Sequence, residues 1–337
     1  MINPISSSET PHFPVMLDEI TRICSPDKGG IYIDCTFGGG GYSKKLLKFS
    51  NTKVIALDRD EFIIKIGQEL EKKYPNRFFF HQKKFSEVNT VVENQLVDAV
   101  IFDLGLSSIQ LNNLKRGFSF KSKDKLDMTM GISDLSAQDA INNLSEIDLK
   151  LIIKILGEED EASKIAKNIV KARLEKKITR VDQLVKIIEK SKKKIFSSKI
   201  NPSTKTFQAL RIYVNKEISE LINGITKATK ILKPGGKLVI VSFHSIEDKI
   251  VKYFFSNFSK NRSNPSRYLP EDNNTACFLF EKYNKKVIKP TSHEIKINNP
   301  SRSAKMRFAI RSKNRFLFPQ NLFKKFGNYL DIEGVDA

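Results

Sequence analysis

A glycine-rich turn behind a short β-type run is the feature that most limits what this chain can fold into. Residues 31–33 are apolar, Asp34 ends the run, and four glycines occupy positions 38–41. A helical pattern then begins near Lys44. This order is typical of a first strand, a tight loop and a helix N-terminus around a nucleotide-like ligand. Glycine is required in such a loop because a side chain would hold the ligand away from the backbone.

The spacing of these glycines favours one class of ligand. Gly38-x-Gly40 lacks the third glycine of the dinucleotide pattern Gly-x-Gly-x-x-Gly, because Ser43 occupies that position. A second β-type run over residues 53–58 ends in Asp58, and a carboxylate there can accept hydrogen bonds from both ribose hydroxyls of an adenosine. We therefore predict S-adenosyl-L-methionine, which carries an adenosine but no phosphate, rather than a nicotinamide cofactor. The alternative is an ordinary glycine-rich turn.

Composition predicts a cytoplasmic globular protein. The 337 residues are 40% hydrophobic, which is enough for one large core and an additional module. No run of about 18 apolar residues indicates a membrane span, and the polar residues 1–10 lack the apolar core of a signal peptide. Three scattered cysteines predict no disulfide framework, as in a reducing compartment. Four histidines without ligand spacing predict no metal.

The formal net charge of +20 is concentrated in two segments. Residues 249–315 hold 16 Lys and Arg against 4 Asp and Glu, and residues 113–203 hold 20 against 13. Localised positive charge is the electrostatic signature of a polyanionic partner such as a nucleic acid. The alternative is a generally lysine-rich composition in which the charged faces are solvated and contact no partner.

Strand and helix patterns alternate along most of the chain, which predicts an α/β fold with a parallel, doubly wound sheet. The predicted strands are residues 31–34, 53–58, 78–81, 97–103 and 237–243. The alternation stops over residues 134–200, where helical periodicity continues without a strand. We therefore predict a discontinuous sheet domain of residues 1–112 and 204–337, interrupted by an inserted helical domain of residues 113–203.

Several polar residues directly follow predicted strands. Ligands of α/β sheets lie outside the carboxyl ends of the strands, and Asp34, Asp58, Asp103 and His244 all fall at such ends. If the fifth predicted strand pairs with the fourth, the loop from Asp103 to Ser107 and the turn at His244 face one crevice. We take Asp103, Ser107 and His244 as candidate catalytic residues. The alternatives are a helix N-cap for Ser107 and a structural turn residue for His244.

Two other segments combine side chains that suit RNA. The loop of residues 116–120 joins an arginine to two phenylalanines that can stack an unpaired base, or it forms a hydrophobic plug. The segment 299–307 alternates small and basic residues, which suits phosphate contacts or an edge strand. Between them, a predicted helix start carries Thr206, Arg211 and Asn215, which are more polar groups than a solvated helix face requires.

Seven motifs occur in order along the chain. They are His12-x-Pro14-Val15, Asp34-x-Thr36-x-Gly38-x-Gly40-Gly41, Asp103-Leu104-Gly105-x-Ser107-Ser108-x-Gln110-Leu111, Arg116-Gly117-Phe118-Ser119-Phe120, Leu126-Asp127-Met128, Thr206-Phe207-Gln208-Ala209-Leu210-Arg211-Ile212 and Ser242-Phe243-His244-Ser245-x-Glu247-Asp248. Together they resemble the family of bacterial 16S ribosomal RNA cytosine-N4 methyltransferases over about residues 12–311. The resemblance departs at Tyr42, where the family usually has histidine, so an imidazole role there is lost.

The resemblance implies a Rossmann-like methyltransferase domain with an inserted helical domain for substrate recognition. It implies methyl transfer from S-adenosyl-L-methionine to the exocyclic N4 amine of one cytosine in the decoding centre of the small ribosomal subunit. The expected partner is therefore 16S ribosomal RNA, and the oligomeric state stays open. By motif position, the implied contacts of the methyl donor are Gly40, Gly41, Tyr42, Asp58, Phe85, Asp103 and Gln110.

Cytosine N4 is a weak nucleophile because its lone pair is delocalised into the ring. A carboxylate such as Asp103, or carbonyl groups of its loop, could accept the N4 hydrogens, localise the lone pair and take the proton late. Two other functions remain. A DNA amino-methyltransferase would carry an Asp/Ser-Pro-Pro-aromatic motif, which residues 103–106 lack. A non-catalytic ribosome-assembly factor would not need Asp34, Asp58 and the glycines intact.

Overall fold

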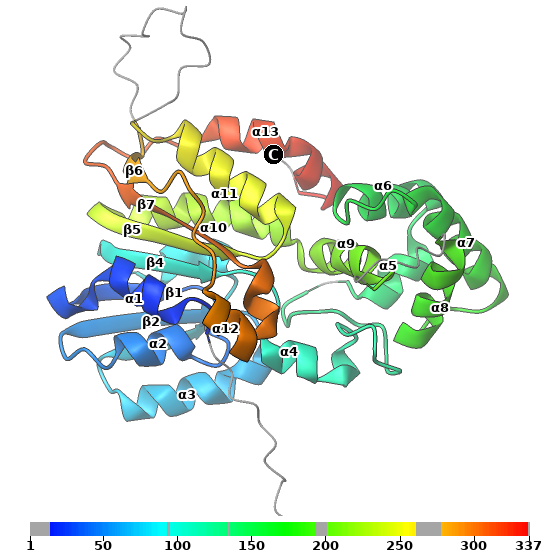
Figure 1. Ribbon diagram of the computed structural model, residues 1–337, viewed down its shortest axis with the longest axis horizontal. Coiled ribbons are helices and arrows are strands. Elements are labelled where there is room, and N and C mark those ends of the chain that lie inside the picture. Colours follow the sequence, from blue (N-terminus) through cyan, green and yellow to red (C-terminus); the bar gives the residue numbers. More distant parts are fainter. Residues whose placement is uncertain (1–13, 93–94, 134, 193–200, 261–277, 336–337) are drawn as a thin grey trace, which may run out of the picture.

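The computed structural model describes residues 14–92, 95–133, 135–192, 201–260 and 278–335. They form a seven-stranded sheet in the order β3-β2-β1-β4-β5-β7-β6 (Figure 1). The strands are β1 (Gly30–Asp34), β2 (Thr52–Asp58), β3 (Phe78–Gln82), β4 (Val97–Asp103), β5 (Leu232–Ser242), β6 (Phe280–Tyr283) and β7 (Lys305–Arg311). Strands β1 to β5 are parallel, whereas β7 is antiparallel to both β5 and β6. The predicted Rossmann-like α/β fold is confirmed.

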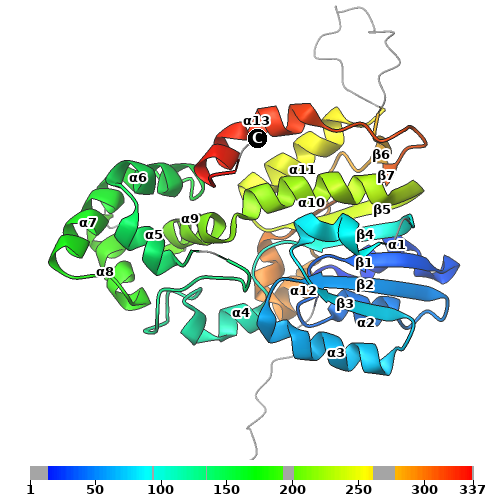
Figure 2. The same ribbon diagram turned by 180° about the vertical axis from the view of Figure 1, so that it is seen from behind.

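Helices cover both faces of the sheet, because successive strand residues present apolar side chains to opposite sides. On one face, Ile33 and Val100 pack with α10, α11 and α13. On the other face, Tyr32 and Ile101 pack in one core with residues of α1, α2 and α3 (Figure 2). These helices are α1 (Leu17–Cys24), α2 (Gly41–Leu46), α3 (Ile64–Lys73), α10 (Glu217–Ile231), α11 (Ser245–Asn257) and α13 (Gln320–Ile332).

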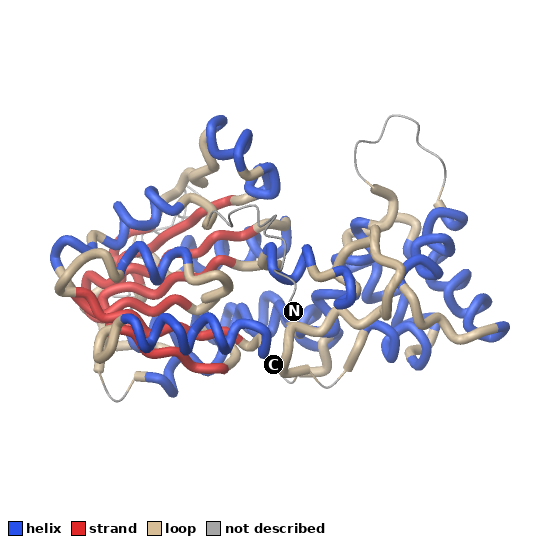
Figure 3. The backbone as a smooth tube through the Cα atoms, turned by 90° about the horizontal axis from the view of Figure 1, so that it is seen from below, coloured by secondary structure: helices blue, strands red, loops and turns tan. Residues whose placement is uncertain are grey.

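Between β4 and β5 the chain builds a helical group with its own core. The helices are α5 (Ala137–Asn143), α6 (Glu146–Ile155), α7 (Ala162–Glu175), α8 (Val181–Ser191) and α9 (Thr204–Asn215). Seen from below, the strands lie together on one side of the molecule and a group of helices lies on the other (Figure 3). Phe207, Leu210 and Val214 of α9 belong to the helical core. The domain boundaries at residues 113 and 203 stay a proposal, and α9 contributes to the core of the inserted helices.

Shorter elements complete the chain, and a few differ from the sequence patterns. They are α4 (Ser108–Asn112), α12 (Ser292–Ile297) and the 3-10 turns η1 (Pro26–Lys28), η2 (Glu61–Ile63), η3 (Phe85–Val91), η4 (Leu114–Arg116) and η5 (Asn299–Ser303). Strand β5 begins earlier than predicted because Leu232 already pairs with Val97 before an irregularity in the register. His12 of the first motif lies outside the described residues. Among the described helices, none is long and apolar enough to cross a membrane.

Asn215 at the end of α9 ties this helix to the loop that enters the inserted helices. Its Oδ1 accepts a hydrogen bond from Met130 N at 2.8 Å, and its Nδ2 donates to Met128 O at 2.8 Å. The side chain is buried, so these backbone groups have no access to water as an alternative partner. This double contact explains a polar residue that the sequence pattern alone left without a role.

We predict that Asn215→Ala lowers the free energy of unfolding by about 2–4 kcal/mol, because it leaves two buried backbone groups without their side-chain partner. Chemical denaturation followed by circular dichroism measures this loss. Asn223→Ala is the matched control, since its Nδ2 donates to Ser219 O within the same helix at 2.9 Å. We expect the control to lose less than about 1 kcal/mol. Equal losses for the two variants would contradict this role of Asn215.

Candidate functional site

A cavity of about 420 Å³ lies at the carboxyl ends of β1, β2 and β4. This is the edge where α/β sheets bind their ligands. Most of the residues predicted from the sequence line it, namely Gly41, Tyr42, Asp58, Phe85, Asp103, Ser107 and Gln110. Two predicted residues do not line it: Gly40 and His244. The structure therefore brings together seven of the predicted side chains and backbone positions, and it assigns different surroundings to the other two.

The glycine loop is held by backbone contacts to the neighbouring strand. Phe37 N donates to Leu57 O at 3.0 Å, and Gly38 N donates to Asp58 Oδ2 at 2.8 Å. Gly40 has a φ of 76°, and a Cβ there would lie 2.8 Å from the ring of Phe37. Gly40 thus makes the turn and packs on Phe37, while Gly38 and the adjacent Gly39 face the cavity.

Asp58 ends β2 with both carboxylate oxygens anchored. Oδ2 accepts from Gly38 N, and Oδ1 accepts from Asp60 N at 2.9 Å. Burial raises the pKa of Asp58 to about 6, partly offset by these hydrogen bonds. Each oxygen keeps a lone pair, so Asp58 can also accept hydrogen bonds from a diol in the cavity. This geometry suits the ribose of an adenosine.

Asp34 is also buried, but it holds the loop instead of facing the cavity. Its Oδ2 accepts from the Ser43 hydroxyl at 2.7 Å, and its Oδ1 accepts from Thr36 N at 3.3 Å. Burial is the main reason that its pKa rises to about 6. The Thr36 hydroxyl in turn accepts from Asp103 N at 2.7 Å. Asp34 and Thr36 therefore connect the glycine loop to the end of β4.

Asp103 is the most perturbed carboxyl group of the cavity. Its Oδ1 is buried and has no hydrogen-bond partner among the described residues, whereas Oδ2 lies 3.0 Å from the Tyr42 hydroxyl. Burial raises the pKa of Asp103 to about 8, and the carboxylates of Asp34 and Glu247 add to the rise. A cavity-lining carboxyl group with one unpartnered oxygen fits a ligand that brings a positive charge or an N–H donor.

Tyr42 places one hydroxyl hydrogen between two acceptors. Its Oη lies 2.6 Å from Val15 O and 3.0 Å from Asp103 Oδ2. Burial raises the pKa of Tyr42 well above its usual value, so the hydroxyl keeps its hydrogen. When that hydrogen is donated to Val15 O, Asp103 must itself be protonated to hydrogen-bond with the Tyr42 oxygen. Tyr42 therefore contacts the key carboxyl group directly, without an imidazole.

Ser107 and Gln110 form a capping box at the start of α4. The Ser107 hydroxyl accepts from Gln110 N at 3.2 Å, and Gln110 Oε1 accepts from Ser107 N at 3.0 Å. The N-cap alternative for Ser107 is thus confirmed. Gln110 Nε2 donates to Asp60 Oδ2 at 2.8 Å, and Arg116 forms a buried ion pair with the same carboxylate. Arg116 is therefore held inside the protein by this ion pair, whereas Phe118 lines a second, smaller cavity.

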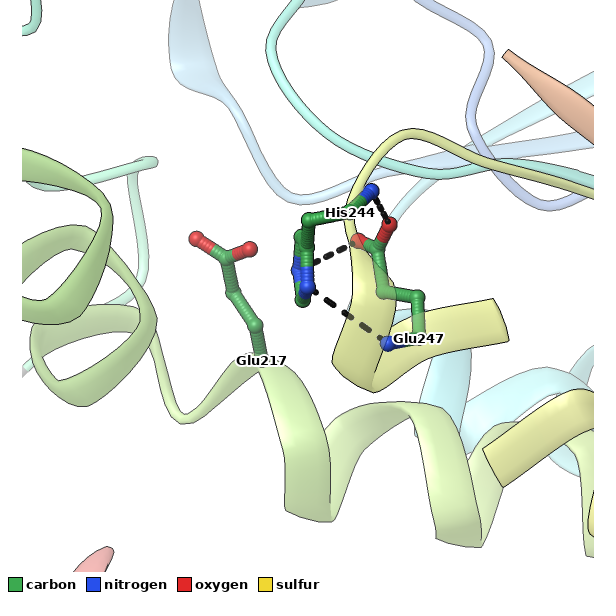
Figure 4. A group of neighbouring side chains, drawn as sticks. All are labelled: Glu217, His244 and Glu247. Atoms are coloured by element: carbon green, nitrogen blue, oxygen red, sulfur yellow. Dashed lines mark hydrogen bonds and ion pairs between the residues drawn. The ribbon is translucent and has the colours of Figure 1, made fainter. Parts of the chain in front are cut away.

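His244 is the N-cap of α11 and lies beside two glutamates (Figure 4). Glu247 N donates to His244 Nδ1 at 3.4 Å, and Glu247 Oε2 accepts from Phe243 N at 2.8 Å. Glu217 accepts two hydrogen bonds from Arg211, at 2.7 and 2.8 Å. Burial acts to raise the pKa of Glu247, but His244 and Arg211 outweigh it and hold the pKa below its usual value.

Glu217, His244 and Glu247 also offer ligand atoms that lie within 4.8 Å of one another, which is close enough to hold a metal ion after small movements. Both glutamates line the large cavity. Sequence motifs alone indicated no role for either glutamate. Glu247 stands in the last motif three residues after His244, which is a capping-box spacing, but Glu217 begins another helix and gives no local signal.

The basic segment near the C-terminus is partly folded into the sheet. Arg307 Nε donates to Asp248 Oδ1 at 2.7 Å, and Lys305 Nζ lies 3.4 Å from Asp248 Oδ2. Arg311 donates to Leu279 O at 2.9 Å from a buried position. Strand β7 lies between β5 and β6, so it is not an edge strand. Arg307 and Arg311 are thus structural, and Asn298 and Pro300 reach the rim of the large cavity.

Two solved structures show distant similarity to this chain. An rRNA methylase from Streptococcus thermophilus shares 12% identity at a TM-score of 0.38, with 86% of this chain and 92% of that chain covered. The N-methyltransferase NodS from Bradyrhizobium japonicum, solved with S-adenosyl-L-homocysteine, shares 8% identity at a TM-score of 0.37, with 88% and 85% covered.

Sequence comparison is far more specific. The chain is 41% identical over 306 residues to ribosomal RNA small subunit methyltransferase H of Ehrlichia ruminantium, covering 89% of this chain and 99% of the relative. It is 41% identical over 334 residues to the protein of that name from Bartonella quintana, covering 99% of both. The model of the MraW methylase family matches residues 9–312. The chain therefore belongs to the MraW methylase family.

Proposed function

We propose that this methyltransferase transfers the methyl group of S-adenosyl-L-methionine to the exocyclic N4 amine of one cytosine in 16S ribosomal RNA. The site of action would be the decoding centre of the small ribosomal subunit, in the cytoplasm. The observation that carries the proposal is that Asp103, whose buried Oδ1 has no hydrogen-bond partner among the described residues, lines the large cavity. The family membership and the names of its relatives support the RNA substrate.

The residues of the large cavity fit the methyl donor. Asp58 would accept the two ribose hydroxyls, as its position at the end of β2 allows. Gly38 and Gly39 would let the ligand approach the loop, and Phe85 would offer an apolar surface. Gln110 would support this wall through its bond to Asp60. The bound donor supplies a methyl group attached to a positively charged sulfur, which lowers the pKa of a nearby carboxyl group such as Asp103.

Asp103 would act on the amine. Its Oδ1 would accept a hydrogen bond from N4, which localises the nitrogen lone pair for attack on the methyl carbon. As the N–C bond forms, the C–S electron pair leaves with the sulfur, and N4 gives one proton to Asp103. Ser107, which lines the cavity and caps α4, would position the Asp103 loop and can donate its hydroxyl hydrogen to substrate. Alignment of the two reacting atoms would supply much of the rate.

The RNA target is tested by incubating the protein with small ribosomal subunits and, separately, with duplex DNA, using a donor labelled in its methyl group. We expect label in N4-methylcytidine of the 16S RNA and none in DNA. Label in DNA would favour an amino-methyltransferase of DNA. Binding of subunits without transfer of label would favour a non-catalytic assembly factor.

We predict that Asp58→Asn weakens the binding of S-adenosyl-L-homocysteine by about tenfold or more, because an amide accepts fewer hydrogen bonds than a carboxylate. Isothermal titration calorimetry measures this affinity. Asp98→Asn is the matched control, since Asp98 lies near the opposite end of its strand and pairs with Lys233 at 2.9 Å. Unchanged affinity in the Asp58 variant would contradict the ribose contact.

We predict that Asp103→Asn lowers turnover by about 100-fold or more, the usual range for loss of a general base. Because burial raises the pKa of Asp103 to about 8, kcat/KM for the donor should rise with pH up to about 8 and then level off. The Asn variant should lack this rise. A pH profile measured with small subunits at saturation tests both statements, and Asp98→Asn should keep the wild-type profile.

Asp103→Asn should lower turnover without lowering the stability of the folded protein. The pKa of Asp103 is raised from 3.8 to about 8 in the folded protein. Its ionisation therefore lowers the free energy of unfolding as the pH rises through that interval. Asp103→Asn should be at least as stable as the wild type at neutral pH. An unstable variant, or one with wild-type turnover, would contradict the assignment.

A further inference from the structure

A second cavity of about 180 Å³ adjoins the large one. Leu106 and Phe243 line both cavities, so they form the shared wall. Leu106 belongs to the turn after β4, and Phe243 to the turn after β5. The opposite side of the second cavity comes from α9 and from the loop that follows η4. This cavity therefore lies where the sheet meets the inserted helices.

Aromatic rings form much of the lining. Phe118 and Phe120 come from the loop after η4, Phe207 from α9, and Phe243 from the turn after β5. The rings of Phe120 and Phe207 meet edge to face, with centroids 6.4 Å apart. Aromatic walls favour a flat unsaturated ring, and stacking of one base on such a ring is worth about 1–3 kcal/mol. The second cavity has less than half the volume of the first, which suits a single pyrimidine.

His244 supplies a polar group at this cavity. Its side chain is 8% exposed and lines the cavity. Nε2 lies 3.1 Å from Glu247 Oε1, within ion-pair distance, and makes no aligned hydrogen bond to a described residue. Nδ1 accepts from Glu247 N, so the hydrogen of the ring sits on Nε2. A buried N–H donor without an aligned acceptor carries a free-energy cost that a ligand can relieve.

We propose that the second cavity receives the target base and that His244 reads its N3 atom. The proposal rests on the methyl transfer proposed above and names the subsite for its acceptor. Nε2–H would donate to N3, which bears a lone pair in cytosine but a hydrogen in uracil, so uracil would set donor against donor. An extruded base is the form in which enzymes reach an exocyclic amine. N4, next to N3 on the same edge, would lie at the wall shared with the donor cavity.

Glu247 and Arg211 would act as positioning residues in this arrangement. Glu247 Oε2 accepts from both Phe243 N and His244 N, at 2.8 and 3.2 Å, and so fixes the turn that carries the ring. Arg211 holds Glu217 by two hydrogen bonds. Glu217 lies on the opposite side of His244 from Glu247 (Figure 4). The guanidinium offsets one of the two carboxylates, which reduces the attraction of the group for a divalent ion.

The test compares cytidine with 3-deazacytidine, which has C–H in place of N3, at the methylated position of reconstituted small subunits. We expect wild-type protein to prefer cytidine in kcat/KM, and His244→Asn to reduce that preference by about 10-fold to 100-fold. Asparagine keeps a good N-cap for α11, so the helix should remain folded. Phe120→Leu is the control, because it changes the aromatic wall and leaves His244 in place. We expect it to raise KM and keep the preference for cytidine.

Each result has one interpretation. If His244→Asn lowers activity equally on small subunits with cytidine and on those with 3-deazacytidine, His244 is a structural residue and the proposal is overturned. The same holds if a chelator abolishes activity and Mn²⁺ restores it, since Nε2 would then be a metal ligand beside Glu217 and Glu247. If the wild type methylates neither substrate, the proposed function itself fails. If the wild type methylates cytidine and 3-deazacytidine equally well, the methyl transfer stands and the base-reading role alone is overturned.

Discussion

The burial of carboxyl groups at the ends of β1, β2 and β4 is the constraint on which the site depends. A buried carboxylate is costly unless donors surround it. The glycine loop supplies such donors to Asp34 and Asp58, which fixes the loop against the sheet. Asp103 is treated differently, because one of its oxygens is left without a partner among the described residues. Asp34 and Asp58 thus hold the glycine loop in place, and Asp103 keeps one oxygen for a ligand.

The inserted helices contribute the part of the site that the sheet does not provide. Strand ends provide Asp58 and Asp103, but the aromatic wall of the second cavity needs Phe207 from α9 and Phe118 from the loop before α5. His244 stands where these two contributions meet. Asn215 holds the loop and α9 together at the same junction. A methyl donor and an acceptor base would therefore be presented from different parts of the chain, and they would meet beside Leu106 and Phe243, which line both cavities.

Local patterns predicted the five parallel strands β1 to β5, because buried parallel strands are continuous apolar runs and several of them end in visible acidic residues. The antiparallel strand β6 was not predicted. The role of Gly40 was not predictable, since its contact with Phe37 depends on the folded turn. Arg116 looked available for RNA, yet its ion pair with Asp60 joins positions far apart in sequence. One neighbour of His244 was hidden for the same reason: Glu217 reaches it from α10. Contacts between distant segments carry no periodic signal.

The most direct measurement of the central claim is the number of protons released when S-adenosyl-L-methionine binds. Titration calorimetry at neutral pH, repeated in buffers of different ionisation enthalpy, gives that number. Because the pKa of Asp103 is raised to about 8, a sulfonium beside it should expel close to one proton. Neutral S-adenosyl-L-homocysteine should expel far less, and Asp103→Asn should abolish the difference. Equal proton release for the two ligands in the wild-type protein would contradict the account.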